Sequence, residues 1–283
     1  MNMYPKISII TPSFNQGLFI EKTIRSIVDQ EYPNLEYIIM DGGSRDDTLD
    51  IIKKYEKYIH YWQSEPDGGQ ANAINKGFAK STGDYLMWVN SDDYLLPGTL
   101  QKYADIHNAH APIDIIVGLG RLIDTEGKIV LEVPPIDEVT LESLYNWRGP
   151  KNKRFAQPSS ILSRKVWEVC GPLDISLQYA FDLDFWIRAK LNNFNFYIVN
   201  EYLSEEHYHT VQKMNAYRHL ANVEIALVII KHGGDKYQKK YLDQMAEKLH
   251  WYETRFKPIL ESRVFKSLIR VKRVFRRNNP TLF

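Results

Sequence analysis

The sequence has a single cysteine, Cys170, which excludes an internal disulfide and favours a reducing compartment. A small buried side chain is the usual role of such a thiol. The sequence also lacks an apolar run of roughly 18 to 20 residues, the length that a membrane-spanning helix requires. Its first residues lack the apolar core of a signal peptide. These absences predict a cytoplasmic protein.

The commonest phosphate-binding motifs are missing as well. Two glycines, Gly68 and Gly69, precede a predicted helix, where backbone N–H groups and the helix N-terminus can meet an anion. The segment has neither the Lys-Ser/Thr ending of a Walker loop nor the G-x-G-x-x-G spacing of a dinucleotide-binding fold. A P-loop NTPase and a nicotinamide-dependent dehydrogenase are therefore disfavoured.

The composition itself is ordinary for a globular protein, with 44% hydrophobic and 25% charged residues. The charge is unevenly distributed along the chain. Residues 255–283 carry nine basic side chains and one acid, a net charge of +8, so residues 1–254 carry −7 of the overall +1. We therefore expect the C-terminal segment to have a different role from the rest of the chain.

Short apolar runs alternate with segments of helical spacing, which predicts a parallel sheet with helices on both faces. The predicted strands are residues 6–10, 37–40, 59–64, 85–89, 113–119, 121–123, 128–133 and 196–199. The predicted helices are residues 18–30, a helix that begins near residue 44, and residues 70–80, 163–169 and 183–191. Residues 137–154 fit either a loop beside a site or a surface connection. Residues 215–277 are predicted to be mostly helix, with a break at Gly233-Gly234.

The predicted strand at residues 85–89 ends on two adjacent carboxylates, Asp92 and Asp93. Adjacent carboxylates repel each other unless a cation or strong donors offset the charge, and divalent cations bind carboxylates together with substrate phosphates. A metal–diphosphate site and a solvated turn both fit this segment on its own. Thr11 and Asp41 end two other predicted strands at the same sheet edge, and this convergence favours a binding site.

Four motifs, taken together and in this order, resemble glycosyltransferase family 2, whose members are inverting, nucleotide-sugar-dependent enzymes. The motifs are residues 9–15, 41–48, 64–77 and 90–93, and the resemblance covers roughly residues 5–210. It implies an α/β fold of the GT-A type, with a mainly parallel central sheet flanked by helices. It also implies a catalytic domain over residues 1–214, with a nucleotide-sugar half at about 1–120 and an acceptor half at about 121–214. Residues 215–283 would be a helical C-terminal extension.

The resemblance assigns donor binding to the matched motifs. Thr11 and Asp41 would hold the nucleoside, with Asp41 facing the base, and Arg45 could help to neutralise the leaving diphosphate. The predicted donor-binding residues are Thr11, Pro12, Ser13, Asn15, Asp41, Gly43, Arg45, Asp67, Gln70, Asn72, Asn75, Asn90, Ser91 and Asp92.

The resemblance also implies a divalent metal cofactor, Mg2+ or Mn2+. Asp92 and Asp93 correspond to the acidic DXD-type motif, in which ribose and the metal-bound diphosphate are held. Asn90 stands where many members have Asp, so the metal would have one anionic ligand fewer. Asp93 and Asp92 are the predicted ligands and His209 is a further candidate, for which an ordinary surface histidine is the alternative.

The catalytic base is expected at a helix start within residues 179–188, which look like the acceptor segment of the family. Phe181 stands where Glu is common, and Asp182 falls on the Asp position. An inverting transfer needs a carboxylate to deprotonate the acceptor hydroxyl. Asp182 is the predicted base and Asp184 the second candidate. Helix capping by Asp182 and a salt bridge of Asp184 are the structural alternatives.

These assignments predict transfer of a sugar from a UDP-linked donor to a hydroxyl of a glycan or lipid-linked acceptor, with inversion, in cell-surface polysaccharide or glycolipid synthesis. A non-catalytic subunit that binds nucleotide or glycan remains an alternative because of Asn90 and Phe181. A sugar nucleotidyltransferase is a second alternative, but the chain lacks the Gly-rich, basic N-terminal loop expected for it.

Residues 263–277 place basic and apolar side chains on different sides of a predicted helix. Such a basic amphipathic helix is suited to an anionic membrane surface, and packing of its apolar stripe on the body is the alternative. A lipid-linked acceptor favours the membrane, which would make the protein peripheral at the inner face of the cell membrane. Nucleic acid is not expected as a partner, because the rest of the chain is acidic.

Overall fold

The computed structural model describes residues 4–146, 154–208 and 218–233, and residues 237, 243, 246, 247, 250 and 254. His209 and the predicted basic helix at residues 263–277 lie outside the described residues. Contacts divide the chain into two units, residues 1–232 and 233–283, at the predicted Gly233-Gly234 break. The fold below is that of the first unit. The domain boundary predicted at residue 214 stays a prediction.

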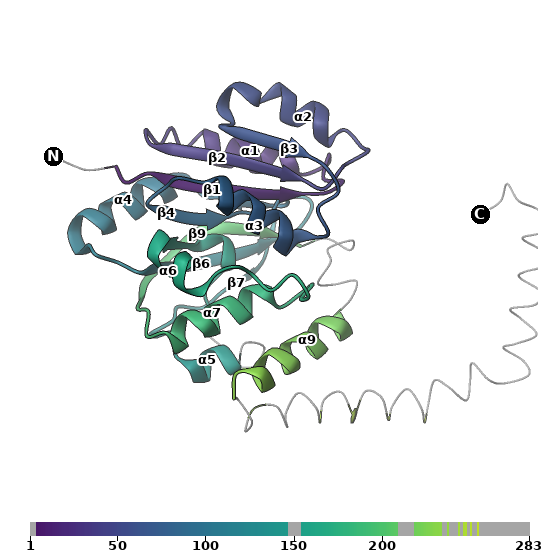
Figure 1. Cartoon of the computed structure of the whole chain (residues 1–283), viewed down its shortest axis with the longest axis vertical. Coiled ribbons are helices and arrows are strands. Elements are labelled where there is room, and N and C mark those ends of the chain that lie inside the picture. The colour runs from purple at the N-terminus through teal and green to yellow at the C-terminus, as the bar shows by residue number, and fades with distance from the viewer. Residues whose placement is uncertain are drawn as a thin grey trace, which may run out of the picture. The chain divides into compact units, whose positions relative to one another are not determined.

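The first part of the chain forms four parallel strands joined by helices (Figure 1). The strands are β1 (Ile7–Ser13), β2 (Leu35–Asp41), β3 (Tyr61–Ser64) and β4 (Tyr85–Trp88). The helices are α1 (Ile20–Val28), α2 (Thr48–Lys54), the 3-10 helix η1 (Glu56–Tyr58) and α3 (Gln70–Lys80). Every residue of β1 and β4 is buried, as expected for strands covered by helices on both faces.

The second part adds strands that make the sheet mixed. They are β5 (Asp93–Leu95), β6 (Ile115–Ile123), β7 (Ile129–Glu132), β8 (Ser160–Ser163) and β9 (Phe196–His207). The sheet order is β3-β2-β1-β4-β8-β6-β9-β5, with β7 paired to β6. The accompanying helices are α4 (Thr99–His110), α5 (Leu141–Tyr145), the 3-10 helix η2 (Gln157–Ser159), α6 (Arg164–Cys170), α7 (Phe181–Leu191) and α9 (Arg218–Lys231). The predicted α/β architecture, a sheet flanked by helices, is confirmed.

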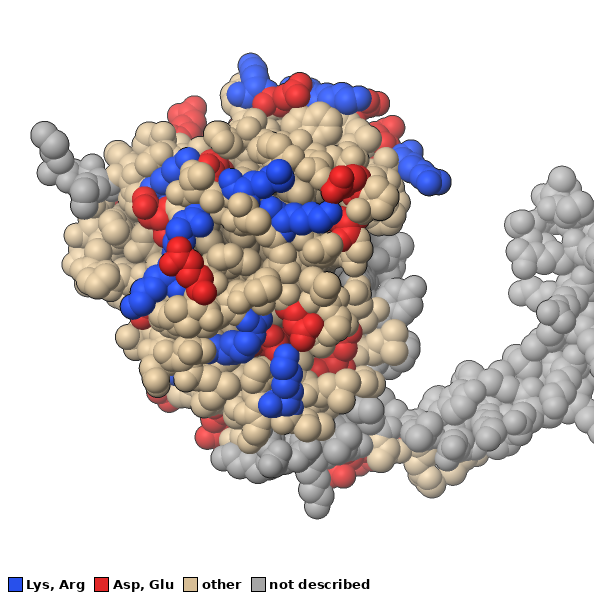
Figure 2. All heavy atoms as spheres, in the orientation of Figure 1, with Lys and Arg blue, Asp and Glu red and all other residues tan. Residues whose placement is uncertain are grey.

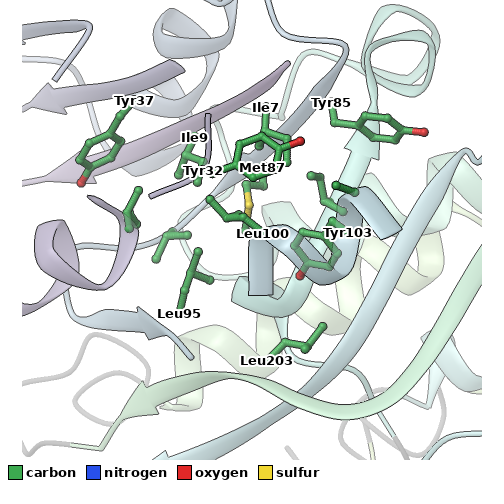
Figure 3. Close-up of a cluster of buried hydrophobic side chains, with 14 of the residues drawn as sticks. Ile7, Ile9, Tyr32, Tyr37, Tyr85, Met87, Leu95, Leu100, Tyr103 and Leu203 are labelled. Carbon is green, nitrogen blue, oxygen red and sulfur yellow. The ribbon is translucent and has the colours of Figure 1, made fainter. Parts of the chain in front are cut away.

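The core on one face of the sheet joins alternate residues of the parallel strands to α1, α2 and α4. Ile7 and Ile9 of β1 pack with Met87 of β4 and with Leu100 and Tyr103 of α4 (Figure 3). On the other face α3 lies close to β1 because Gly77 has no side chain: a Cβ there would come within 2.5 Å of Ile10. Burial on both faces fixes the register of the strands and hence where each strand ends.

Two predictions of local structure were wrong. Residues 113–119 and 121–123 were predicted as separate strands, but Gly118 and Gly120 lie within the single strand β6. The glycines serve close packing, since a Cβ on Gly118 would lie 2.6 Å from Leu203 of β9. The strand predicted at residues 196–199 is longer than predicted and continues to His207 as β9.

Two observations on the described residues concern contact with a membrane: the length of their helices and the distribution of charge on one face. Among the described residues, no helix is long and apolar enough to cross a bilayer. On the described part of the face in Figure 2, Lys and Arg side chains are interspersed with Asp and Glu side chains. The excess of basic residues found in the sequence falls on residues 255–283, which are outside the described part.

Candidate active site

A cavity of about 690 Å3 opens where β1 and β4 end. Its walls come from five parts of the chain: the end of β1, the loop before α3, the segment after β4, residues 154–158, and the start of α7. Three single residues complete the lining: Gly42 directly after β2, Glu206 of β9 and Ile225 of α9. The carboxyl ends of parallel strands thus form the ligand-accessible edge, as in other open α/β sheets.

The cavity brings together about half of the predicted site residues. Those that line it are Pro12, Ser13, Asp67, Gln70, Asn90, Ser91, Asp92, Asp93 and Asp182. Those that do not line it are Thr11, Asn15, Asp41, Gly43, Arg45, Asn72, Asn75 and Asp184. The lining set contains both the acidic strand end and the predicted base, and the roles of these residues in binding and catalysis stay predictions.

Asn90 acts as a bridge within the acidic segment. Its Nδ2 donates a hydrogen bond to Asp93 Oδ2 at 2.9 Å, and its Oδ1 accepts one from Gln70 Nε2 at 2.6 Å. An aspartate at this position would have no donor for Asp93 and would place a second negative charge against it. The departure from the acidic pattern therefore has a local reason, which is to support a buried carboxyl group.

Asp93 lies among other acids. Its side chain is 4% exposed, and it pairs with Glu206 across the antiparallel strands β5 and β9. Burial raises the pKa of Asp93 well above its usual value, and the charges of Asp92 and Glu206 raise it further. Burial also raises the pKa of Glu206, opposed by Arg154 and reinforced by Asp182 and Asp92. The two carboxyl groups therefore ionise less readily than exposed acids, and a cation bound beside them would favour their charged forms.

The oxygen donors of this segment fit a hard divalent cation of the Mg2+ or Mn2+ type. Among the described residues, no group of three or more His, Cys, Asp or Glu side chains converges closely enough to form a metal site by itself. The fit is therefore to a cation that takes one or two carboxylates, from Asp93 and Asp92, and completes its shell with phosphate oxygens and water.

Asp41 supports the wall of the cavity rather than lining it. Its carboxylate is 2% exposed and accepts hydrogen bonds from Gly43 N, Ser44 N, Ser44 Oγ and Ser64 Oγ at 2.5 to 3.0 Å. A carboxylate can accept about four hydrogen bonds, so these four donors match its acceptor capacity. A contact between Asp41 and the nucleobase of the donor, as predicted from the sequence, would have to replace one of these hydrogen bonds.

Several other predicted donor-binding residues also hold the loops around the cavity. Thr11 is fully buried, and its Oγ1 accepts a hydrogen bond from Tyr37 at 3.1 Å. Asn15 Oδ1 accepts one from the backbone N of Arg45, at 3.0 Å. Asn72 Nδ2 donates to the carbonyl of Asp67. Asn75 exchanges two hydrogen bonds of 2.9 Å with the backbone of Leu173.

Ser13 differs from these residues because it lines the cavity and its Oγ has no hydrogen-bond partner among the described residues. Its side chain is only 4% exposed. A buried hydroxyl without a partner costs free energy unless a ligand completes it. Ser13 Oγ is therefore a candidate contact for a polar ligand.

The two candidate bases differ in position. Asp182 lies in the first turn of α7, lines the cavity, and accepts a hydrogen bond from the backbone N of Leu183 at 2.7 Å. Asp184 is fully buried and contacts Arg188, Lys231 and His232 at 2.8, 3.1 and 2.9 Å. Burial alone would raise the pKa of Asp184, but the hydrogen bond from His232 and the Arg188 charge hold it well below its usual value. These contacts are those of the predicted salt bridge.

Glu206 was missed by sequence reasoning. The predicted strand stopped at residue 199, so the adjacent acids Glu205 and Glu206 were not placed in the sheet. Extending the two-residue alternation of β9 would have put one of the pair toward the site. Arg154 was not singled out either. It is the last residue of the irregular stretch 137–154, for which a loop beside a site was one of two alternatives, and it lines the cavity.

Comparison with known proteins gives the family of the chain. The family model described as Glycosyl transferase family 2 matches residues 8–168, more than half of the chain. An uncharacterized glycosyltransferase of Rickettsia typhi is 30% identical over 213 residues, which cover 75% of this chain and 66% of that protein. A putative teichuronic acid biosynthesis glycosyltransferase of Bacillus subtilis, TuaG, is 30% identical over 210 residues, 72% of this chain and 79% of that one.

A solved structure shares the fold. The crystal structure of Staphylococcus aureus TarS 1-349 in complex with UDP-GlcNAc superposes with a TM-score of 0.65 over 89% of this chain and 77% of that one. The sequences are 19% identical, so the likeness concerns the fold. It agrees with the GT-A architecture that the sequence predicts.

Proposed function

The chain belongs to glycosyl transferase family 2, and we propose that it moves a sugar from a UDP-linked donor to a hydroxyl of a glycan or lipid-linked acceptor, with inversion. The observation that carries this proposal is that Asp182 and the acidic segment Asn90-Ser91-Asp92-Asp93 line one cavity. A carboxylate that can take a proton and a segment that can hold a diphosphate are thus available to the same ligand.

The proposed reaction is a single displacement. Asp182 accepts the proton of the acceptor hydroxyl while that oxygen attacks the anomeric carbon of the donor. The bond from the anomeric carbon to the diphosphate oxygen breaks on the opposite face, and the electron pair leaves with the nucleoside diphosphate. Asp182 needs no partner acid, because the diphosphate departs without protonation by the protein.

The diphosphate would lie against Asp92 and Asp93, which would hold Mg2+ or Mn2+. Such a cation supplies positive charge to the leaving group when it is bound. Two observations support this assignment: Asp93 is buried among acids, and Asn90 donates to it instead of adding a further charge. Arg154 lines the same cavity and can add a second positive charge.

Ser13, Asp67 and Gln70 are the proposed contacts of the nucleoside diphosphate sugar, since each lines the cavity on the side of the parallel strands. Thr11, Asp41, Asn72 and Asn75 would act by holding the surrounding loops. A UDP-linked donor is supported by the structural neighbour, which was solved with UDP-GlcNAc.

The acceptor is proposed to belong to cell-surface polysaccharide or glycolipid synthesis, as the printed name of the Bacillus subtilis relative suggests. Residues 263–277 would bring the enzyme to an anionic membrane surface at its cytoplasmic side, and their basic, amphipathic sequence supports this. Liposome flotation of the full chain against a 1–254 truncation tests the contact, and equal binding would exclude it.

A donor screen tests the proposed activity. The full chain should release nucleoside diphosphate from one of a panel of UDP-, GDP- and dTDP-sugars when acceptor and Mn2+ are present. Asp182→Asn should lower turnover by about 10³-fold or more while the affinity for UDP is retained. Asp29→Asn, at an exposed site on α1's C-terminal side, is the matched control and should be fully active. Binding of nucleotide without turnover on any donor would instead support the non-catalytic alternative.

A further inference from the structure

Glu224 of α9 holds the backbone immediately before α7. Its carboxylate accepts hydrogen bonds from three successive N–H groups, those of Gln178 at 2.9 Å, Tyr179 at 2.6 Å and Ala180 at 3.1 Å. Successive backbone N–H groups form an anion-binding concavity, and hydrogen bonds to a charged acceptor are stronger than neutral ones. A side chain 44 residues away from Ala180 thus fixes the path of this segment.

The held segment is part of the cavity wall. Residues 178–183 all line the cavity, and Asp182 follows Ala180 by two positions. The local sequence does not fix this helix start, because the N-cap residue Ala180 has no side-chain oxygen. Glu224 instead fixes, from another helix, the three residues that lead into α7, whereas an N-cap side chain would bind N–H groups inside the first turn.

The same helix reaches α7 a second time, on the other side of Asp182. Lys231 lies seven residues after Glu224, two turns of helix and hence the same face, and it contacts the buried carboxylate of Asp184 together with His232. Ile225, next to Glu224, lines the cavity itself. The chain is thus bonded to α9 both before Asp182, at residues 178–180, and after it, at Asp184.

We propose that Glu224 is a positioning residue for the transfer reaction: it sets the place of the Asp182 carboxylate by fixing residues 178–180. This inference rests on the proposed function, in which Asp182 is the base. The contact of Lys231 with Asp184 has the separate role of packing the two helices, because Asp184 does not line the cavity. Helix α9, which follows the family match ending at residue 168, then belongs to the active site.

The test compares Glu224→Ala and Glu224→Gln with the control Lys231→Met in the full chain. Glutamine keeps one acceptor but turns an amide group toward backbone donors, so both Glu224 variants should free residues 178–180. We expect kcat to fall about 10- to 100-fold, with KM for the donor and the Kd for UDP unchanged. Hydrogen exchange of the peptide over residues 178–183 should become faster. Lys231→Met should lower the thermal midpoint at least as much while it keeps kcat.

The inference is overturned if the Glu224 variants keep the wild-type kcat, or if kcat falls equally in Lys231→Met, since the helix contact would then act through stability alone. Unchanged exchange of residues 178–180 in Glu224→Ala would equally overturn it. If the wild-type chain releases no nucleoside diphosphate from any donor, the proposed function fails and the catalytic role of Glu224 fails with it. The exchange measurement still decides in that case whether Glu224 fixes the segment.

Discussion

Asp93 and Glu206 lie opposite each other in the antiparallel pairing of β5 with β9, and both line the cavity. The pairing puts a buried carboxyl group beside a second acid, with Asp92 adjacent. Neighbouring negative charges disfavour the ionisation of both carboxyl groups. The ligand-free protein therefore holds this part of the site in an electrostatically unfavourable state, which a bound cation would relieve.

Replacing Glu206 should separate the stability of the site from its affinity for a cation. Glu206→Gln removes one of the repelling charges, so the ligand-free protein should become more stable by about 1 kcal/mol. The apparent affinity for Mn2+ in the presence of UDP should fall about tenfold, which corresponds to roughly 1.4 kcal/mol. Calorimetric titration and thermal unfolding measure the two effects. Glu205→Gln, the neighbouring position in β9 that does not line the cavity, is the control and should change neither.

Asn90→Asp tests the bridge to Asp93. The substitution removes the Nδ2 donor and adds a charge next to a buried carboxyl group, so the free energy of unfolding should fall by about 1 to 3 kcal/mol without metal. Saturating Mn2+ with UDP should recover most of this loss, because an additional anionic ligand then becomes favourable. Thermal midpoints with and without Mn2+ provide the comparison, and a loss of stability that Mn2+ does not change would contradict a cation at this position.

Ser13→Ala should affect ligand binding without harming the fold. The hydroxyl has no partner among the described residues, so its removal should leave the free energy of unfolding unchanged or slightly higher. The affinity for UDP should fall by about 5- to 10-fold, as expected for one hydrogen bond. Ser8→Ala, at the other end of β1, is the matched control. It breaks a bond to Glu36 and should lower stability while the affinity for UDP is kept.

The parallel half of the fold could be predicted because its signals are local. Helix α3 was predicted at residues 70–80 and is found there, and β1, β2 and β4 follow the predicted apolar runs. Strand ends carry Asp, Ser and Gly residues, which mark where the backbone leaves the sheet. The shared edge of parallel strands predicted that Thr11 and Asp41 converge with Asp92 and Asp93. Asp92 and Asp93 line the cavity, but Thr11 and Asp41 do not, and Ser13 at the end of β1 lines it with them.

The residues that escaped prediction act through contacts between distant parts of the chain. Glu206 lies in the second half of β9, where residues 200–207 are mostly polar and lack the apolar alternation that marks a strand. Glu224 meets its partners 44 to 46 residues earlier in the sequence, and no spacing rule connects them. Asp41 was predicted to face the nucleobase of the donor. The turn that follows Asp41 supplies N–H donors for its carboxylate instead. Only the three-dimensional structure shows how such acceptors are used.

Away from the cavity, the buried carboxylate of Glu36 pairs with the partly exposed Lys6, and this pair should govern stability in acid. Its side chain is 1% exposed and accepts hydrogen bonds from Lys6 at 2.7 Å, Ser8 at 2.5 Å and Thr82 at 2.6 Å. Burial alone would raise the pKa of Glu36, but these hydrogen bonds lower it to about 2. The pKa in the unfolded chain is near 4.5. A pKa lowered by folding means that the contribution of this group is fully present above pH 4.5 and is lost as the pH falls toward 2.

Glu36→Gln should therefore be less stable than the wild type by up to about 3 kcal/mol at pH 7, since one pKa unit corresponds to about 1.4 kcal/mol. The difference should shrink below pH 4.5 and largely vanish near pH 2, where the wild-type carboxyl group is protonated as well. Urea unfolding of both proteins between pH 2 and 7 measures this difference. Glu126→Gln, at an exposed position in the turn before β7, is the control and should match the wild type throughout. A difference between Glu36→Gln and wild type that stays constant over this range would assign the effect to packing instead of charge.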